Sequence, residues 1–175
     1  MGGAYYDMGQ FHKAIICCEQ ALQMAIERED AERQHHYMGV MGRVYSNLGK
    51  PRAIDLYQQA ITIARRLEDH HHAGVYLGRL SVAYRRSGQV QQAITLYQEA
   101  LSLLRESSDR AEYERHLGDL GSAYRELGQF EKVIQFHSAP AEQRRGALRP
   151  AGRPPAGVGA HPADPVADQR GGRGR

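Results

Sequence analysis

Residues 80–88 read LSVAYRRSG, and the residues that follow include Ala93, Tyr97 and Ala100. Gly88 lies between two apolar stripes with the spacing of α-helices. The stripes are Leu77, Leu80 and Tyr84 before the glycine, and Ala93, Tyr97, Ala100, Leu101 and Leu104 after it. A glycine suits the residue just past a helix end, where a positive φ angle is needed. This stretch therefore predicts two helices joined by a tight turn.

The same pattern recurs along the chain. A tyrosine stands four residues before a glycine at Tyr5/Gly9, Tyr45/Gly49, Tyr84/Gly88 and Tyr124/Gly128, so the glycines are 40, 39 and 40 residues apart. A small or β-branched residue follows at Ala14, Ala53, Ala93 and Val133, and a further residue four positions later at Cys18, Tyr57, Tyr97 and His137. One helix pair cannot cover its own apolar face, whereas stacked pairs can. The repeat therefore predicts an all-α array of helix–turn–helix units.

This arrangement resembles the tetratricopeptide repeat family. The match covers about residues 1–137, with two intact copies flanked by a partial copy at each end. The second copy offers Met41-Gly42, Tyr45, Gly49, Ala53, Tyr57 and Ala60, and the fourth offers Leu120-Gly121, Tyr124 and Gly128. The family's usual period is about 34 residues, so this chain is closer to a long-repeat variant of about 40. The resemblance implies a right-handed α-solenoid of three and a half to four repeats.

The resemblance also implies a function. In this family the leading helices line a concave groove that binds peptide segments, and the chain is expected to be a non-catalytic protein-interaction scaffold. The corresponding groove positions are Gly39, Arg43, Ser46, Asn47, Gly78, Arg79, Val82, Arg85, Arg86, Gly118, Asp119, Ser122 and Arg125. The three glycines would leave room for a ligand backbone. The arginines would offer paired donors to carboxylates, which suggests an acidic peptide. Alternatively, the arginines are solvated or paired with acidic neighbours such as Asp119 and Glu126.

Composition divides the chain at Ser138. Of the 38 residues from Ser138 to Arg175, Ala, Gly, Arg and Pro make up 28, and Phe, Tyr and Trp are absent. Such a segment cannot bury enough apolar surface to offset the entropy of ordering, so residues 138–175 are predicted to form a disordered tail. The abrupt end of the repeat pattern fits two explanations, a genuine tail or an out-of-frame product of a G/C-rich gene.

The array lacks the polar capping units usual in solenoids. We therefore expect a fragment of a larger regulatory protein, with possible self-association through its uncapped ends. The tail ends in Gln169-Arg170-Gly171-Gly172-Arg173-Gly174-Arg175, which resembles an RNA-binding Arg-Gly-Gly box. Nucleic-acid association through this tail is the alternative function. It is the less favoured one, because the box is one short copy without aromatic residues to stack on bases.

The remaining polar residues predict no catalytic, cofactor or metal site. The clusters His35-His36 and His70-His71-His72 fall near helix starts and are interpreted as exposed, with weak nickel or zinc binding as the alternative. Cys17 and Cys18 are adjacent and cannot link distant segments by a disulfide, so a reducing cytoplasmic setting is expected. Both are interpreted as buried thiols. The formal net charge is +3, and no apolar run is long enough to cross a bilayer.

Overall fold

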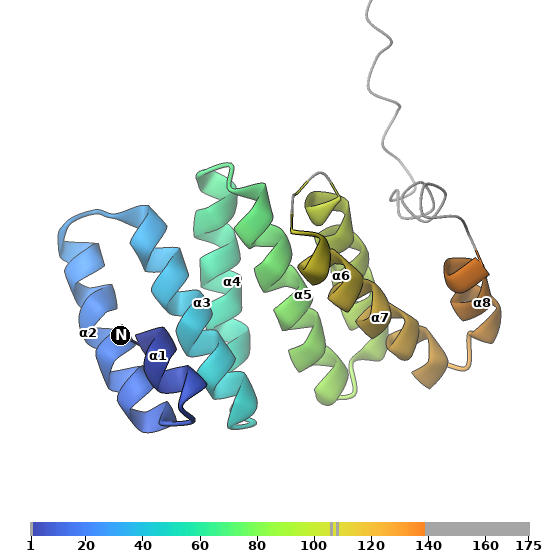
Figure 1. The fold of residues 1–175 in the computed structure, drawn as a ribbon, viewed down its shortest axis with the longest axis horizontal. Helices are drawn as coiled ribbons and strands as arrows, with labels where there is room; N and C mark the ends of the chain where they lie inside the picture. Colours follow the sequence, from blue (N-terminus) through green and yellow to red (C-terminus); the bar gives the residue numbers. More distant parts are fainter. Residues whose placement is uncertain (1, 106, 108, 139–175) are drawn as a thin grey trace, which may run out of the picture.

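The computed structural model describes residues 2–105, 107 and 109–138 of the chain. These residues form helices and turns, without a strand among them. The helices are α1 (Gly2–Asp7), α2 (Phe11–Glu27), α3 (Ala31–Asn47), α4 (Arg52–Arg66), α5 (His70–Arg86), α6 (Val90–Leu104), α7 (Arg110–Glu126) and α8 (Phe130–Ser138). The helix pairs follow one another in chain order along the long axis of the molecule (Figure 1). The predicted all-α solenoid is confirmed.

The turn inside each helix pair has the conformation that the glycine repeat predicts. Gly9, Gly49, Gly88 and Gly128 have φ angles of 71°, 64°, 84° and 69°. At Gly88 the turn is closed by two backbone hydrogen bonds, from Gly88 N to Arg85 O at 3.0 Å and from Gln89 N to Tyr84 O at 2.9 Å. These bonds satisfy carbonyl groups that the end of a helix leaves without partners.

Aspartates begin the leading helix of each of the last three pairs. The side chains of Asp30, Asp69 and Asp109 accept hydrogen bonds from the backbone N–H three residues ahead, at 3.0, 3.0 and 3.1 Å. Such caps each stabilise a protein by about 1 kcal/mol. They fix where α3, α5 and α7 start, and so they fix the register of each new repeat.

The repeated small and aromatic residues form the core. Ala14, Ala53 and Ala93 are buried, as are the larger residues one helical turn later, Cys18, Tyr57 and Tyr97. Their burial confirms the predicted stripe of the trailing helices. Small alanines allow close packing of the helix backbones, and the aromatic rings fill the space between consecutive pairs.

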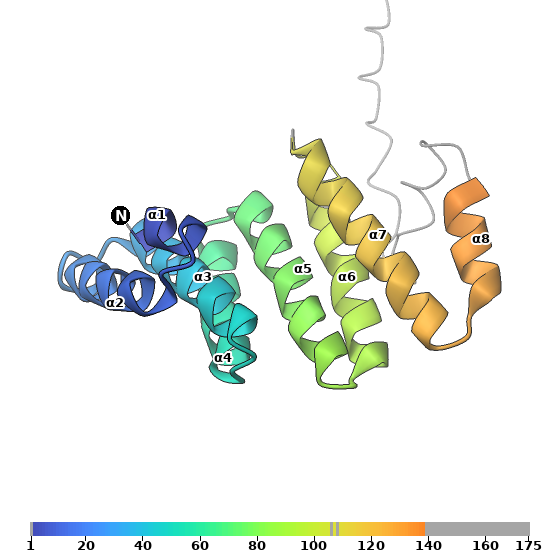
Figure 2. The same cartoon turned by 60° about the horizontal axis from the view of Figure 1, so that its bottom comes forward.

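The helices lie in two layers. The leading helices contact one another, α1 with α3, α3 with α5 and α5 with α7, whereas the described trailing helices α2, α4 and α6 make no comparable contacts among themselves. Figure 2 shows α3, α5 and α7 side by side. In a curved array, the layer whose helices approach most closely is the inner one. The leading helices therefore form the more closely packed layer of the array, and the resemblance places the groove on this layer.

The helices at the two ends of the array are shorter than the leading helices in its middle. Helix α1 has 6 residues and α8 has 9, whereas α3, α5 and α7 have 17 each. Helix α8 ends at Ser138, and the rest of the predicted disordered tail, residues 139–175, lies outside the described residues. Within the described part, no helix combines the length and apolar character that a bilayer crossing demands.

Candidate peptide-binding groove

The predicted groove residues lie on α3, α5 and α7, but two of the three glycines do not leave room for a ligand. A Cβ atom on Gly39 would stand 2.3 Å from the Tyr76 ring, and one on Gly78 would stand 2.1 Å from the His116 ring. Each glycine is a socket for a side chain from the next leading helix. The expectation that Gly39 and Gly78 accommodate a ligand backbone is therefore wrong, because the next repeat fills that space. Gly118 is exposed, and none of the described residues places an atom within 4 Å of its Cβ position.

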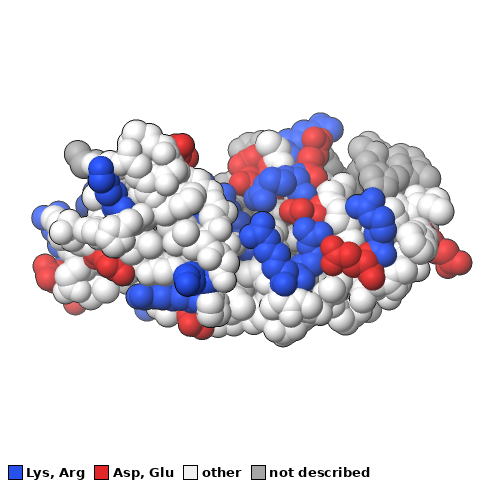
Figure 3. All heavy atoms as spheres, turned by 90° about the horizontal axis from the view of Figure 1, so that it is seen from below, with Lys and Arg blue, Asp and Glu red and all other residues white. Residues whose placement is uncertain are grey.

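The groove arginines on α5 pair with acids on α7. Arg85 bonds to Glu126 at 3.0 Å and approaches Asp119 at 3.9 Å, and Arg79 bonds to Glu112 at 3.3 Å. Figure 3 shows basic and acidic side chains interleaved where these helices lie. Arg79 and Arg85 are therefore paired with acidic neighbours, which is the alternative interpretation from the sequence.

These pairs alter the titration of the acids. Burial works to raise the pKa of the Glu112 carboxyl, but a hydrogen bond from Arg115 and the charges of Arg115 and Arg79 bring it below its usual range. Burial raises the pKa of Asp119, and Arg85 opposes that rise. Fully exposed ion pairs contribute about 0–1 kcal/mol each, whereas these side chains are mostly half-buried. The pairs link α5 to α7.

The groove is more basic between α3 and α5. Helix α5 carries no acidic residue, and Glu32 is the one acid within α3. Arg43 of α3 instead reaches back to α1, where it lies 4.0 Å from Asp7 and 4.0 Å from the ring centroid of Tyr6. Two buried donors, the Nε–H groups of Arg43 and Arg79, have no acceptor among the described residues.

Tyr57 lies beneath this basic section. Its ring sits against Gly42 of α3, where a Cβ atom would come within 2.7 Å of the ring. Burial raises the pKa of the Tyr57 hydroxyl to about 12, while the charges of Arg79 and Arg43 oppose the rise. Both guanidinium groups therefore lie close to one hydroxyl. Sequence reasoning placed Tyr57 in the core but did not connect it with the groove.

The remaining predicted groove residues are placed as follows. Asn47 donates to the Tyr6 hydroxyl at 2.8 Å, and Arg86 donates to the Ser46 carbonyl at 3.3 Å. Val82 packs partly buried against the core cluster around Tyr97. Ser122 bonds to the Gly118 carbonyl at 3.1 Å and accepts from exposed Arg125 at 3.2 Å. These contacts leave Arg86 and Arg125 exposed at the rim of the groove.

The histidines are less exposed than the sequence suggested. His35 is buried, with its Nδ1 atom 3.2 Å from the Tyr76 hydroxyl and its ring 5.3 Å from that of His72. His72 in turn lies 2.6 Å from Asp69. The prediction of exposed histidines is wrong for His35, because Tyr76 and His72 of the next leading helix cover it.

His116 is a buried residue that sequence reasoning missed. It fills the Gly78 socket, and burial, with the charge of Arg115, lowers its pKa to about 4. The sequence contains a signal for such a residue, because an aromatic side chain stands two positions before each groove glycine, at Tyr37, Tyr76 and His116. Cys18 is buried as predicted, whereas Cys17 is half-buried. In the described residues, no three His, Cys, Asp or Glu side chains gather as metal ligands would.

Comparison with curated proteins returned no significant match. Among solved structures, BtubC (BKLC) from P. vanneervenii is 22% identical with a TM-score of 0.71, over 97% of this chain and 68% of that one. A putative kinesin light chain from Podosopora anserina with nearly identical TPR-like repeats is 21% identical with a TM-score of 0.64, over 84% of this chain and 78% of that one. At these identities the likeness shows a shared fold.

A family profile gives the assignment independently of the coordinates. The profile described as "Tetratricopeptide repeat" matches residues 1–66, 36–106 and 73–138, three overlapping windows that together span the whole array. They include the glycine turns and the small-residue positions on which the helix pairs depend. The chain belongs to the tetratricopeptide repeat family.

Proposed function

We propose that this protein is a non-catalytic interaction scaffold whose concave groove binds a peptide segment with an acidic side chain. Repeats of this family generally mediate protein–protein interactions. The observation that carries the more specific proposal is the basic section between α3 and α5. There the buried Nε–H groups of Arg43 and Arg79 have no described acceptor, although other nitrogens of the two guanidinium groups pair with Asp7 of α1 and Glu112 of α7.

A ligand carboxylate suits this position for energetic reasons. A buried donor without an acceptor costs about 1–3 kcal/mol. A ligand carboxylate recovers that cost when the guanidinium groups turn to present their Nε–H groups, which are buried in the unbound protein. Arginine presents its donors in a planar fork that matches a carboxylate. A ligand would exchange an existing ion pair at any of these arginines, since Arg79, Arg43 and Arg85 already pair with Glu112, Asp7 and Glu126. Arg43 and Arg79 differ from Arg85 in that each also keeps a buried donor without an acceptor among the described residues. We therefore place the acidic ligand residue near Arg43 and Arg79.

A scaffold role also fits the shape of the groove. Its candidate residues are spread over the three helices α3, α5 and α7, whereas catalysis by preorganised dipoles needs one site from which water is excluded. We propose no enzymatic activity. Since Cys17 and Cys18 are both free thiols, we place the scaffold in a reducing cytoplasmic compartment.

Fluorescence anisotropy with a labelled acidic peptide tests the proposal. The probe is an extended peptide of about ten residues that alternates Asp or Glu with small residues, and its Asn/Gln counterpart is the control. We expect Arg43→Glu and Arg79→Glu each to weaken binding of the acidic peptide by about tenfold or more. Arg66→Glu is the matched control, because Arg66 is exposed and makes no ion pair within the described region. Equal affinity for the acidic and amide peptides, or unchanged affinity in both groove variants, would reject the proposal.

A further inference from the structure

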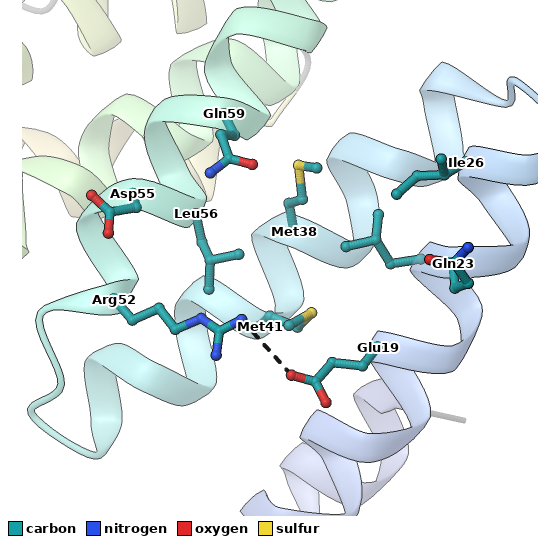
Figure 4. A pocket seen from close by; sticks show the side chains of 10 residues that line it. Glu19, Gln23, Ile26, Met38, Met41, Arg52, Asp55, Leu56 and Gln59 are labelled. Atoms are coloured by element: carbon teal, nitrogen blue, oxygen red, sulfur yellow. Dashed lines mark ion pairs between the residues drawn. The ribbon is translucent and has the colours of Figure 1, made fainter.

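A second groove lies on the opposite layer, between the trailing helices α2 and α4. A depression of about 290 Å³ is lined by side chains of α2, α3 and α4 (Figure 4). It adjoins a second depression of about 510 Å³ that continues along α4. The two share Met38, Asp55 and Gln59, so they form one continuous surface, which we call the α2–α4 groove.

Comparison with the junction between α4 and α6, one repeat further on, explains why the α2–α4 groove is open. Arg65 of α4 forms an ion pair with Glu99 of α6, and so ties those two trailing helices together. When the repeats are aligned on Ala14, Ala53 and Ala93, the corresponding residues of α2 and α4 are Ile26 and Gln59. An isoleucine and a glutamine cannot form an ion pair, and Ile26 remains 48% exposed.

The repeats also differ at the other end of the α2–α4 groove. Gln58 donates to the Tyr84 hydroxyl at 3.1 Å, and Gln98 donates to the Tyr124 hydroxyl at 2.9 Å, one repeat further on. The corresponding residue of α2 is Glu19, which cannot donate. Arg52 takes its place as the donor to the Tyr45 hydroxyl, at 3.3 Å. It also forms an ion pair with Glu19 at 3.9 Å (Figure 4).

The groove has an apolar floor. Met38 and Met41 rise from α3 beneath it, Leu56 lies on its α4 side and Leu22 on its α2 side. Figure 4 shows Met38 pointing into the space between the two helices, with Ile26 facing it. Methionine is unbranched and flexible, and it adapts its shape to an incoming side chain. This surface therefore suits apolar side chains of more than one shape.

The rim of the groove is acidic. Glu19 and Asp55 line it together with a single base, Arg52, which is already engaged with Glu19. Asp55 is exposed and makes no ion pair with any described residue. The corresponding residue of α6 is Thr95, so this carboxylate is peculiar to the α2–α4 groove. Because the Asp55 carboxylate has no ion-pair partner among the described residues, a basic side chain of a ligand can pair with it beside the apolar floor.

We propose that the α2–α4 groove docks an amphipathic helix of a partner protein, with apolar residues on Leu22, Ile26 and Met38 and a lysine or arginine beside Asp55. The lining extends along α4 from Arg52 to Ile63, which is about 17 Å or three helical turns. A helix laid between two others places its side-chain ridge in the groove between them. This surface is separate from the concave groove, so both can be occupied at once.

The test uses a synthetic helical peptide of about 14 residues, with leucines at i, i+4 spacing flanked by lysines, and a counterpart with glutamates in place of lysines. Fluorescence anisotropy with the full chain should show binding of the lysine peptide and at least about tenfold weaker binding of the glutamate peptide. If the two bind equally, or if neither binds, the proposal is overturned.

Variants of the groove locate the contact. Ile26→Arg with Gln59→Glu installs the pair found between Arg65 and Glu99, and should weaken lysine-peptide binding about tenfold or more by closing the groove. Asp55→Thr copies Thr95 and should weaken binding severalfold even if the double variant fails to fold. Glu131→Thr removes an exposed acid near the start of α8, outside the α2–α4 groove, and is the matched control that should bind as the unaltered chain does. Full affinity in Asp55→Thr, or loss of binding in Glu131→Thr, would contradict the assignment.

Discussion

The middle of the array and its C-terminal end use the same sequence position in different ways. In the middle, Gly39 receives Tyr76 and Gly78 receives His116, so that each leading helix is locked to the next. At the end, Gly118 stands at the corresponding position of α7 and is open. Helix α8 beside it exposes Phe130 and Ile134, at 59% and 65%. The role of a repeat residue thus depends on which repeat packs against it, as well as on its place in the pattern.

This comparison predicts that a charged substitution in a middle helix lowers the free energy of unfolding more than the same substitution in the last helix. Ala93→Glu puts a carboxylate at a fully buried position of α6. We expect it to lower the free energy of unfolding by more than about 4 kcal/mol, because a buried charge without a partner is among the costliest changes. Urea denaturation followed by circular dichroism measures the loss.

The matched variant at the end is Val133→Glu, the corresponding position in α8. Val133 is only half-buried, so its substitution should cost less than about 2 kcal/mol. Equal losses at the two positions would contradict the difference between middle and end.

The histidine in the Gly78 socket predicts an acid-sensitive junction. Because the native pKa of His116 is lowered to about 4, the unfolded chain binds its proton first as the pH falls below about 6.5. The contribution of His116 to the free energy of unfolding is therefore fully present above pH 6.5 and is lost progressively as the pH falls to 4. Between pH 7 and pH 5 the expected loss from this group is about 2 kcal/mol.

His35, whose pKa is also lowered by burial and by His72, should add a loss in the same direction. Asp69 and Glu32 oppose that shift in His35, and Glu112 opposes the shift in His116. Unfolding measured at both pH values in His116→Gln isolates the larger contribution. That variant should show a clearly smaller pH dependence, and an unchanged dependence would exclude His116 as its source.

Much of the fold could be predicted from the sequence because its determinants are local. A glycine at the end of a helix needs only its own positive φ angle, and the alanine and tyrosine stripes follow from helical periodicity. For this reason Gly88, Ala93 and Tyr97 were assigned correctly from spacing alone. The helix starts at Asp30, Asp69 and Asp109 are also local, and the capping preference of aspartate could have found them.

The candidate site was harder to predict because its determinants cross between repeats. Whether Gly39 and Gly78 are open depends on Tyr76 and His116, which lie 37 and 38 residues further along the chain. The pairing of Arg85 with Glu126 spans 41 residues. Helical periodicity places each residue on a face of its own helix, but it does not say which side chain of the next helix meets it.

The smallest of the expected effects tests the central claim most directly, namely that successive repeats lock by filling glycine sockets. Gly78→Ala puts a methyl group against the His116 ring and should destabilise the chain by about 1–2 kcal/mol, the cost of overpacking less the gain in helix propensity. Gly118→Ala meets no described atom and should stabilise it by about 0.5–1 kcal/mol, since alanine favours a helix over glycine. Urea unfolding of the two variants, measured side by side, should give changes of opposite sign. Changes of the same sign would contradict the account.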